Sequence, residues 1–244
     1  FPYPTLFRSD GQPVDFTWKA NGTLSATLPA LGTSSHQVSL TVSDACGNLA
    51  RKSVTISGTA ATRFADMQKH WASTYTTPLN DKSIISGVTA NGKTNFLPDQ
   101  KITRGDFALM TANWLGLDLS RYAGVSLPYA DAASIPKWDE NAVKALYAEG
   151  IMQGSKAGDG SLRANAKASI TRAEAMTILG RILPQGYPQA SLTGFSDAAS
   201  VPSWSKDHVA TLVELKVVGG SNGKLDPNAS VTRAEVAKML FTLW

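Results

Sequence analysis

Three arginines stand where their guanidinium groups could bind an acid. Arg104, Arg172 and Arg233 each follow a threonine that is itself preceded by an apolar β-branched residue. This pattern predicts a helix start, where backbone amides lack intrahelical partners and the helix dipole is positive. Guanidinium groups bind carboxylates through two parallel hydrogen bonds. The three sites therefore favour carboxylate recognition, and the alternative is that each arginine pairs with a nearby Asp or Glu as a structural strut.

The residues around these arginines predict how the helices begin. Two of the three sites fit a capping box, in which a threonine oxygen accepts from a helix-start amide and a glutamate three positions later bonds back to the threonine amide. The first site has an aspartate at the glutamate position and is a shortened version. The cap-supporting residues are Thr103 with Asp106, Thr171 with Glu174, and Thr232 with Glu235.

The chain repeats itself from Thr62 onward. When Trp71, Trp138 and Trp204 are aligned, the same offsets bring leucines, apolar pairs, glycines and the threonine–arginine sites into register. The predicted repeats are 62–118, 127–183 and 193–244.

Each repeat should contain two helices. In the second repeat Trp138 opens the first helix, Gly150 ends it, and Ile151 and Met152 form a buried connection to a turn-rich loop. The first helix of the first repeat contains Pro78 and is expected to be short or kinked. We expect the three second helices to pack against one another.

Two other residue types recur in all three repeats, each with two interpretations. Trp71, Trp138 and Trp204 could stack on a sugar ring, or their indoles could pack in the core. Aspartates 66, 131 and 197 each follow an aromatic residue by two positions and are expected to cap turns or helices.

Residues 10–60 have a different composition, rich in Thr, Ser, Val and Gly. Apolar residues alternate with polar ones between turn signals at Asn21-Gly22 and Gly47-Asn48, which predicts antiparallel strands. Residues 38–56 resemble the last hairpin of bacterial immunoglobulin-like and PKD-like domains. The segment is too short for a seven-stranded sandwich, so we expect a small or incomplete sheet. Residues 1–9 show no pattern and are left outside the predicted fold as a segment that could be foreign.

Composition excludes several classes of function. The chain has 244 residues, 43% hydrophobic, with a net charge of +4. It has no Lys/Arg-rich tract and no apolar run long enough to span a bilayer, so neither nucleic acid binding nor membrane insertion is expected. Cys46, the one cysteine, is expected to be a partly buried strand residue. Because the chain does not begin with Met, we expect it to be the C-terminal part of a longer protein.

No pattern predicts catalysis. His36, His70 and His208 are isolated and lack metal-ligand spacing. Nucleophile, phosphate-loop and dinucleotide motifs are missing, and the adjacent carboxylates of Asp139 and Glu140 would not face one another on a helix. The sequence predicts a protein that is not an enzyme and needs no cofactor or metal.

The repeat resembles the S-layer homology repeat over about 180 residues. The resemblance lies in the aromatic-x-Asp start, the early tryptophan, the Gly-Ile-Met-Gln-Gly segment at 150–154, and above all the Ile-Thr-Arg-Ala-Glu motif at 170–174. The motif reads Val-Thr-Arg-Ala-Glu at 231–235 and Ile-Thr-Arg-Gly-Asp at 102–106. The resemblance implies a mainly α fold, with three helical repeats in a pseudo-threefold module around a central helix bundle, preceded by the small antiparallel sheet.

The resemblance also implies a function. Grooves between neighbouring repeats would bind an acidic secondary cell-wall polymer, commonly through a sugar carrying a ketal-linked pyruvate, with the motif arginines as contacts. The implied location is extracellular, at the bacterial cell wall or S-layer surface. The alternatives are an anchor for a glycan hydrolase domain further upstream and a subunit of an S-layer lattice. Because of Gly105 and Asp106, we expect the groove that uses Arg104 to be the weakest. The oligomeric state is not indicated.

Overall fold

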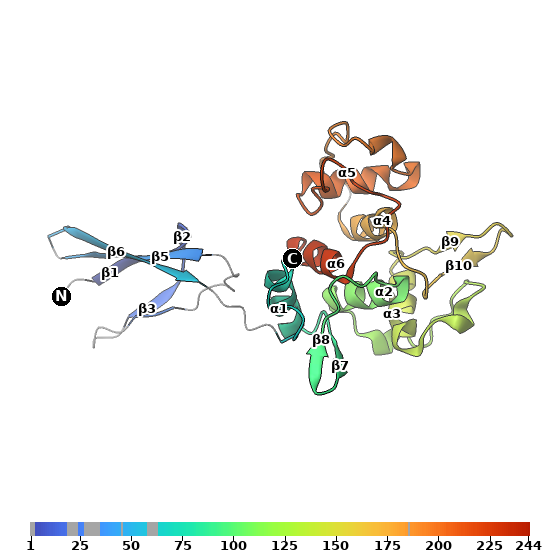
Figure 1. The fold of residues 1–244 in the computed structure, drawn as a ribbon, viewed down its shortest axis with the longest axis horizontal. Helices are drawn as coiled ribbons and strands as arrows, with labels where there is room; N and C mark the ends of the chain where they lie inside the picture. Colours follow the sequence, from blue (N-terminus) through green and yellow to red (C-terminus); the bar gives the residue numbers. More distant parts are fainter. Residues whose placement is uncertain (1–2, 19–23, 27–34, 45, 58–62, 185) are drawn as a thin grey trace. The chain divides into compact units, whose positions relative to one another are not determined.

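The computed structural model describes residues 3–18, 24–26, 35–44, 46–57, 63–184 and 186–244. The chain forms two compact units, Phe1–Arg63 and Phe64–Trp244 (Figure 1). The first unit contains strands and the second contains all six α-helices of the described residues. The chain thus combines the expected helical repeats with small antiparallel sheets.

The first unit contains a four-stranded antiparallel sheet and a hairpin. The sheet has the order β2-β1-β5-β6, and β3 pairs with β4. The alternating segments do form strands, whereas the predicted turn at Asn21-Gly22 lies outside the described residues. The strands are β1 Tyr3–Ser9, β2 Gln12–Pro13, β3 Phe16–Trp18, β4 Leu24–Ala26, β5 Ser35–Ser43 and β6 Leu49–Ser57.

Two features of this unit differ from the sequence-based expectation. Residues 1–9 show no pattern in the sequence, but β1 lies within them and pairs with both β2 and β5. Cys46 was expected to be partly buried in a strand, but it is exposed in the turn between β5 and β6. The Asp44 carboxylate accepts from the amides of Cys46 and Asn48, so the acid organises this turn.

The second unit contains six α-helices and short strands between them. The helices are α1 Ser73–Asp81, α2 Arg104–Trp114, α3 Lys137–Ala148, α4 Arg172–Ile182, α5 Lys206–Glu214 and α6 Arg233–Thr242. The strands are β7 Val88–Ala90, β8 Lys93–Asn95, β9 Ser155–Lys156 and β10 Leu162–Arg163. The 3₁₀-helices are Leu119–Tyr122, Ala132–Ser134, Ala198–Ser200 and Ser203–Ser205. None of the described helices is long and apolar enough to cross a membrane.

The predicted helix signals occur at the ends of these helices. Thr171 and Thr232 form complete capping boxes with Glu174 and Glu235, and the Thr103 side chain accepts from the amide of Asp106. Gly150 follows α3 with a φ of 71°, a conformation that glycine adopts without strain. Pro78 lies inside α1, which ends after nine residues as a short helix.

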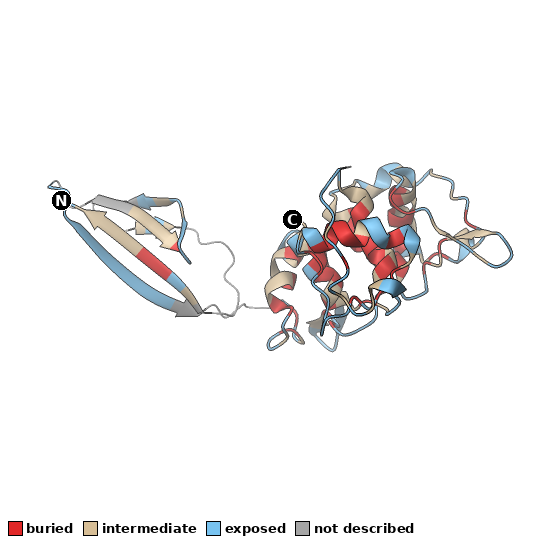
Figure 2. Ribbon diagram, turned by 90° about the horizontal axis from the view of Figure 1, so that it is seen from above, coloured by how far each residue is buried: buried red, intermediate tan, exposed pale blue. Residues whose placement is uncertain are grey.

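Helix packing joins different repeats. The second helix of each repeat packs mainly on the first helix of another: α2 on α3, α4 on α5, and α6 on α1. Between the second helices themselves, α2 also contacts α6. The contact between α2 and α6 agrees with the expectation that the second helices pack against one another, although each of them packs more extensively on a first helix. Buried residues line the facing sides of these helices (Figure 2).

The contact between α2 and α3 explains why the first motif departs from the other two. Asp139 on α3 is only 1% exposed, and a Cβ added at Gly105 would lie 2.3 Å from its Oδ2 atom. The equivalent pair in the next contact is Ala173 and Ser205, both buried. The glycine is therefore required by the bulk of the neighbouring aspartate.

We predict that Gly105→Ala destabilises the second unit by about 1–3 kcal/mol, because the new methyl group overlaps the Asp139 carboxylate. Adding Asp139→Ser should recover most of this loss, since it recreates the Ala173–Ser205 combination. Urea unfolding followed by far-ultraviolet circular dichroism reports on the helical unit. Equal stability of the single and double variants would contradict the steric explanation.

Stability should also depend on the proton of Asp139. Burial, followed by the nearby Asp106 carboxylate, raises the pKa of Asp139 to about 7. The Oδ1 atom has no hydrogen-bond partner within the part of the chain that the structure describes. The ordinary pKa of an unfolded Asp is about 3.9, so the folded unit holds a proton that the unfolded chain releases.

We therefore predict that the free energy of unfolding falls as the pH rises from about 4 to about 7. The Asp139→Asn variant should lose this decline and be more stable than the original chain at pH 8, by on the order of 1 to 3 kcal/mol. Urea titrations at acidic and alkaline pH measure the difference. A decline of the same size in the variant would exclude Asp139 as its source.

Candidate functional site

A closed cycle of backbone hydrogen bonds joins the residues that precede the three motif threonines. The amide of Ile102 donates to the carbonyl of Val231, that of Val231 to Ile170, and that of Ile170 to Ile102, each at 3.1 Å. All three side chains are buried. The starts of α2, α4 and α6 are thereby held close together.

The amides at the helix starts are already occupied. The amides of Arg172 and Ala173 donate to the carbonyls of Ala229 and Pro227 in the following repeat. The helix start at Arg104 donates to residues 168 and 166 in the same way, and that at Arg233 to residues 100 and 98. The expectation that free amides would attract a carboxylate was therefore wrong. Any anion at these sites must be bound by side chains.

The repeated aspartates bind backbone amides rather than capping helices. The Asp131 carboxylate accepts from the amides of Ala164 and Asn165, both at 2.8 Å. Asp66 binds the amides of Phe96 and Leu97 in the same way, and Asp197 binds those of Leu225 and Asp226. Each aspartate thus holds the segment that leads into the motif of its own repeat.

The motif arginine of the preceding repeat binds the same segment from the other side. Nε of Arg104 donates to the carbonyl of Ala164 at 2.9 Å, and Nε of Arg172 donates to that of Leu225 at 2.8 Å. Nε of Arg233 donates to the carbonyl of Phe96, 137 residues away in sequence. Ala164, Leu225 and Phe96 are therefore each bonded by an aspartate of their own repeat and by an arginine of the preceding repeat.

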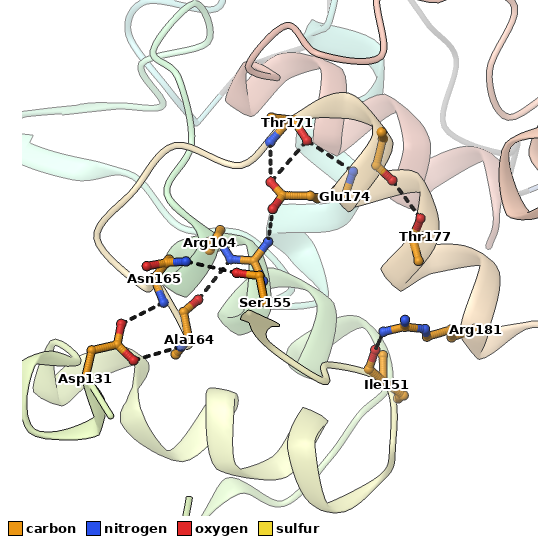
Figure 3. Close-up of polar contacts among 11 residues, drawn as sticks. Arg104, Asp131, Ile151, Ser155, Ala164, Asn165, Thr171, Glu174, Thr177 and Arg181 are labelled. Atoms are coloured by element: carbon orange, nitrogen blue, oxygen red, sulfur yellow. Dashed lines mark hydrogen bonds and ion pairs between the residues drawn. The ribbon is translucent and has the colours of Figure 1, made fainter. Parts of the chain in front are cut away.

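Two of the arginines also pair with the capping glutamate of the next repeat. Nη1 of Arg104 lies 2.8 Å from Glu174, and Nη1 of Arg172 lies 2.7 Å from Glu235. Figure 3 shows Arg104 between the Ala164 carbonyl and the Glu174 carboxylate. The strut interpretation of these arginines is correct. It does not exclude a ligand role, because both arginines line grooves.

Arg233 makes different contacts. In the equivalent position its acidic partner would be Asp106, which is one methylene shorter than glutamate, and no ion pair joins the two among the described residues. Nη2 of Arg233 instead donates to the carbonyl of Ser86, and its guanidinium lies 4.7 Å from the centre of the Phe96 ring. The Gly105–Asp106 departure therefore changes the partners of Arg233, whereas the expectation that the Arg104 groove is the weakest stays a prediction.

The first groove has a volume of about 380 Å³ and takes residues from all three repeats. The first repeat contributes Arg104, the third contributes Trp204, and the second contributes the connecting segment and α4. The cations in this groove are Arg104, Lys156 and Arg181, and the one acid is Glu174.

The second groove has a volume of about 350 Å³ and is built in the same way one repeat further on. Arg172 comes from the second repeat, Trp71 and Lys101 from the first, and the remainder from the third. Its cations are Lys101, Arg172 and Lys238, and its acids are Asp226 and Glu235. In both grooves the glutamate already neutralises the motif arginine. This leaves two cations in the first groove, and two cations with the Asp226 carboxylate in the second.

The three tryptophans are exposed at the surface. Trp71, Trp138 and Trp204 are 53%, 69% and 56% exposed, so the core-packing interpretation was wrong for all three. Trp204 lines the first groove and Trp71 the second, whereas Trp138 lines neither. An exposed indole beside a cationic groove can stack on the apolar face of a ring while its polar edge stays hydrated.

Sequence reasoning missed four groove cations: Lys101, Lys156, Arg181 and Lys238. They occupy positions that differ between repeats, so the alignment that revealed the motif gave them no weight. Arg181 is the most buried of these four residues. Burial lowers its pKa, followed by the charge of Arg104, and its Nη1 donates to the carbonyl of Ile151. Two guanidinium groups therefore face the same groove.

His70 and His208 have partners of their own. His70 accepts the amide of Ala72 and contacts Asp99, and His208 packs on Gly180. No group of three or more His, Cys, Asp or Glu side chains with metal-binding geometry occurs among the described residues.

The family model of the S-layer homology domain matches residues 63–108, 128–176 and 194–237. Each matched segment lies inside one of the three repeat ranges derived from the sequence. All of the groove elements described above therefore belong to the matched part of the chain or to the helix ends that adjoin it.

Several curated proteins are similar to this chain over most of its length. An amylopullulanase of Thermoanaerobacterium thermosulfurigenes is 32% identical over 74% of this chain and 9% of its own length. The exoglucanase XynX of Acetivibrio thermocellus is 30% identical over 74% of this chain and 16% of its own. The S-layer protein sap of Bacillus anthracis is 26% identical over 70% of this chain and 20% of its own. The chain thus spans a fifth or less of these relatives.

We predict that Arg104→Met destabilises the second unit by about 2–4 kcal/mol, because it leaves the Ala164 carbonyl and Glu174 without their partner. The matched control is Arg163→Met, which breaks an ion pair with Asp159 at the surface and should cost less than about 1 kcal/mol. Urea unfolding of the two variants tests this. Losses of equal size would contradict a strut role for Arg104.

Proposed function

Because this chain belongs to the S-layer homology family, whose domains are cell-surface anchoring modules, we propose that it holds its protein on a bacterial cell wall by binding an acidic wall polysaccharide. The observation that carries the proposal is the pair of grooves, each with a motif arginine, two further cations and an exposed tryptophan. The proposed location is extracellular, at the cell wall.

The proposed architecture is a pseudo-threefold module around a central helix bundle. The closed hydrogen-bond cycle through Ile102, Ile170 and Val231 supports it, as does the cyclic pairing of each second helix with the first helix of the next repeat. In such a module the grooves fall at repeat boundaries. A single isolated repeat would then lack a complete groove.

The proposed ligand is a sugar that carries a carboxylate, such as a ketal-linked pyruvate. In the first groove Arg181 and Lys156 supply positive charge beyond the neutralised Arg104, and in the second groove Lys101 and Lys238 do so. A charge-assisted hydrogen bond to a carboxylate contributes about 1.5–3 kcal/mol. The sugar ring would lie against Trp204 or Trp71.

Two grooves would act together on one polymer. A chain of linked sugars that occupies the first groove raises the local concentration of ligand at the second, which strengthens overall attachment without new contacts. The Arg233 position contributes less in this proposal, because its guanidinium is held by Ser86 and Phe96.

The proposed function of this chain is limited to anchoring. The relatives carry a similar unit in hydrolases and in S-layer proteins alike. The hydrolases match this chain over only a small share of their own length, so their activities are not transferred to it.

We predict that the double variant Trp71→Ala, Trp204→Ala binds purified cell-wall sacculi at least about tenfold more weakly than the original chain, which corresponds to about 1.4 kcal/mol. Both indoles are exposed, so the fold should be retained. Trp138→Ala is the matched control, since it removes an equally exposed indole outside the two grooves and should bind within about twofold of the original chain.

The measurement is a pull-down with sacculi, with circular dichroism to verify the fold. Unchanged binding by the double variant, or an equal loss in the control, would remove the grooves as the binding site. If the proposed charge recognition is correct, sacculi stripped of acidic substituents should bind neither the original chain, nor the double variant, nor the Trp138→Ala control.

A further inference from the structure

A smaller pocket lies beside the first groove, between the end of α4 and the start of α5. It has a volume of about 210 Å³, which is space for a single sugar ring rather than for a larger ligand. We call it the Tyr187 pocket, and its lining includes Gly180, Tyr187, Gln189, Trp204, Asp207 and His208. All of these residues belong to the second and third repeats and the segment that joins them.

The Tyr187 pocket shares a wall with the first groove. Trp204 lines both spaces. The end of α4 also borders both, because Arg181 lines the first groove and the neighbouring Gly180 lines the pocket. A chain of linked sugars could pass across the edge of Trp204 from one to the other.

The polar groups of this pocket are available. The side chains of Tyr187, Gln189 and Asp207 make no hydrogen bond or ion pair within the described part of the chain, and Tyr187 is 41% exposed. A phenol, an amide and a carboxylate offer both donors and acceptors to sugar hydroxyl groups. Two aromatic rings, Tyr187 and Trp204, can contact the apolar face of the same sugar.

The charge of the Tyr187 pocket differs from that of the groove. Asp207 is its one acid, and the lining contains no Lys or Arg. Burial, followed by the charge of Arg181, lowers the pKa of His208, which disfavours the imidazolium form. A neutral sugar that donates hydroxyl hydrogen bonds to Asp207 suits this pocket, whereas an acidic sugar suits the groove.

Gly180 allows His208 to pack closely against α4 beside the pocket. A Cβ at Gly180 would lie 2.6 Å from the Cβ of His208 and 2.7–2.8 Å from two atoms of its ring. The residues that align with this pair beside the second groove are Phe241 and Tyr75, whose rings pack edge to face at 5.4 Å and extend to Trp71 and Trp244. Aromatic side chains thus occupy the equivalent region of the second groove.

We propose that the Tyr187 pocket is a second sugar subsite, which binds a neutral residue of the same polysaccharide whose acidic residue occupies the first groove. The inference rests on the proposed anchoring function. The two grooves would then differ in what they bind. The first groove and its pocket would bind an acidic sugar and a neighbouring neutral sugar, whereas the second groove would bind only the acidic sugar.

The test uses the full chain with Trp71→Ala, so that the first groove dominates binding. The probes are two fragments of purified wall polymer that keep the acidic terminal sugar: the terminal monosaccharide and the terminal trisaccharide. We expect the trisaccharide to bind about tenfold more tightly than the monosaccharide in titration calorimetry. Adding Tyr187→Ala and Gln189→Ala should abolish that difference while monosaccharide affinity stays within about twofold.

The matched control is Gln68→Ala, at an exposed position of the first repeat, which should leave both affinities unchanged. Equal affinities for the two fragments before the pocket is altered, or a parallel loss for both afterwards, would overturn the subsite while leaving the groove in place. Failure of both fragments to bind even the unmodified chain would instead refute the anchoring proposal, and this inference with it.

Discussion

The second unit depends on three short segments that complete one another through their backbones. The amides and carbonyls of Ile102, Ile170 and Val231 form a closed cycle, and the helix that follows each segment gives its first amides to carbonyls of the next repeat. Buried amides without partners are costly, so each helix start needs its neighbour in order to be stable. No repeat can satisfy these groups alone, and the three repeats are bound into one unit.

This arrangement gives the motif arginine two tasks. Its Nε bonds a carbonyl in the next repeat, and in two of three cases a second nitrogen pairs with the next capping glutamate. The guanidinium groups of Arg104 and Arg172 also border a groove. A single residue therefore joins two repeats and marks the place where a ligand could meet them, so structural and binding roles cannot be separated by removing the arginine. Substitutions of the exposed tryptophans separate them better.

The three boundaries between repeats are not equivalent, and the reasons are local. An aspartate replaces glutamate at position 106, and Arg233 instead donates to the carbonyl of Ser86 and packs over the Phe96 ring. A glycine at position 180 packs against His208 beside the first groove, where the aligned position in the third repeat carries a phenylalanine that packs on Tyr75. A repeated backbone framework thus keeps its hydrogen bonds while single side chains change what each boundary offers to a ligand.

The sequence by itself determined the local structure of this protein: the three repeats, the capping boxes at Thr171 and Thr232, the end of α3 at Gly150 and the short α1. These features depend on residues three or four positions apart, which the spacing displays directly. The strands of the first unit followed from alternation in the same way, although β1 carried too weak a pattern to be recognised.

Only the tertiary structure decided which repeat supplies the bonding partners of which other repeat. The aspartates proved to bind amides about thirty residues away, the tryptophans proved to be exposed, and Gly105 proved to be dictated by Asp139. Such contacts arise where the chain returns on itself, as between Arg233 and Phe96. Periodicity within one helix or strand carries no information about that return, because it records the face that is buried and not the partner that buries it.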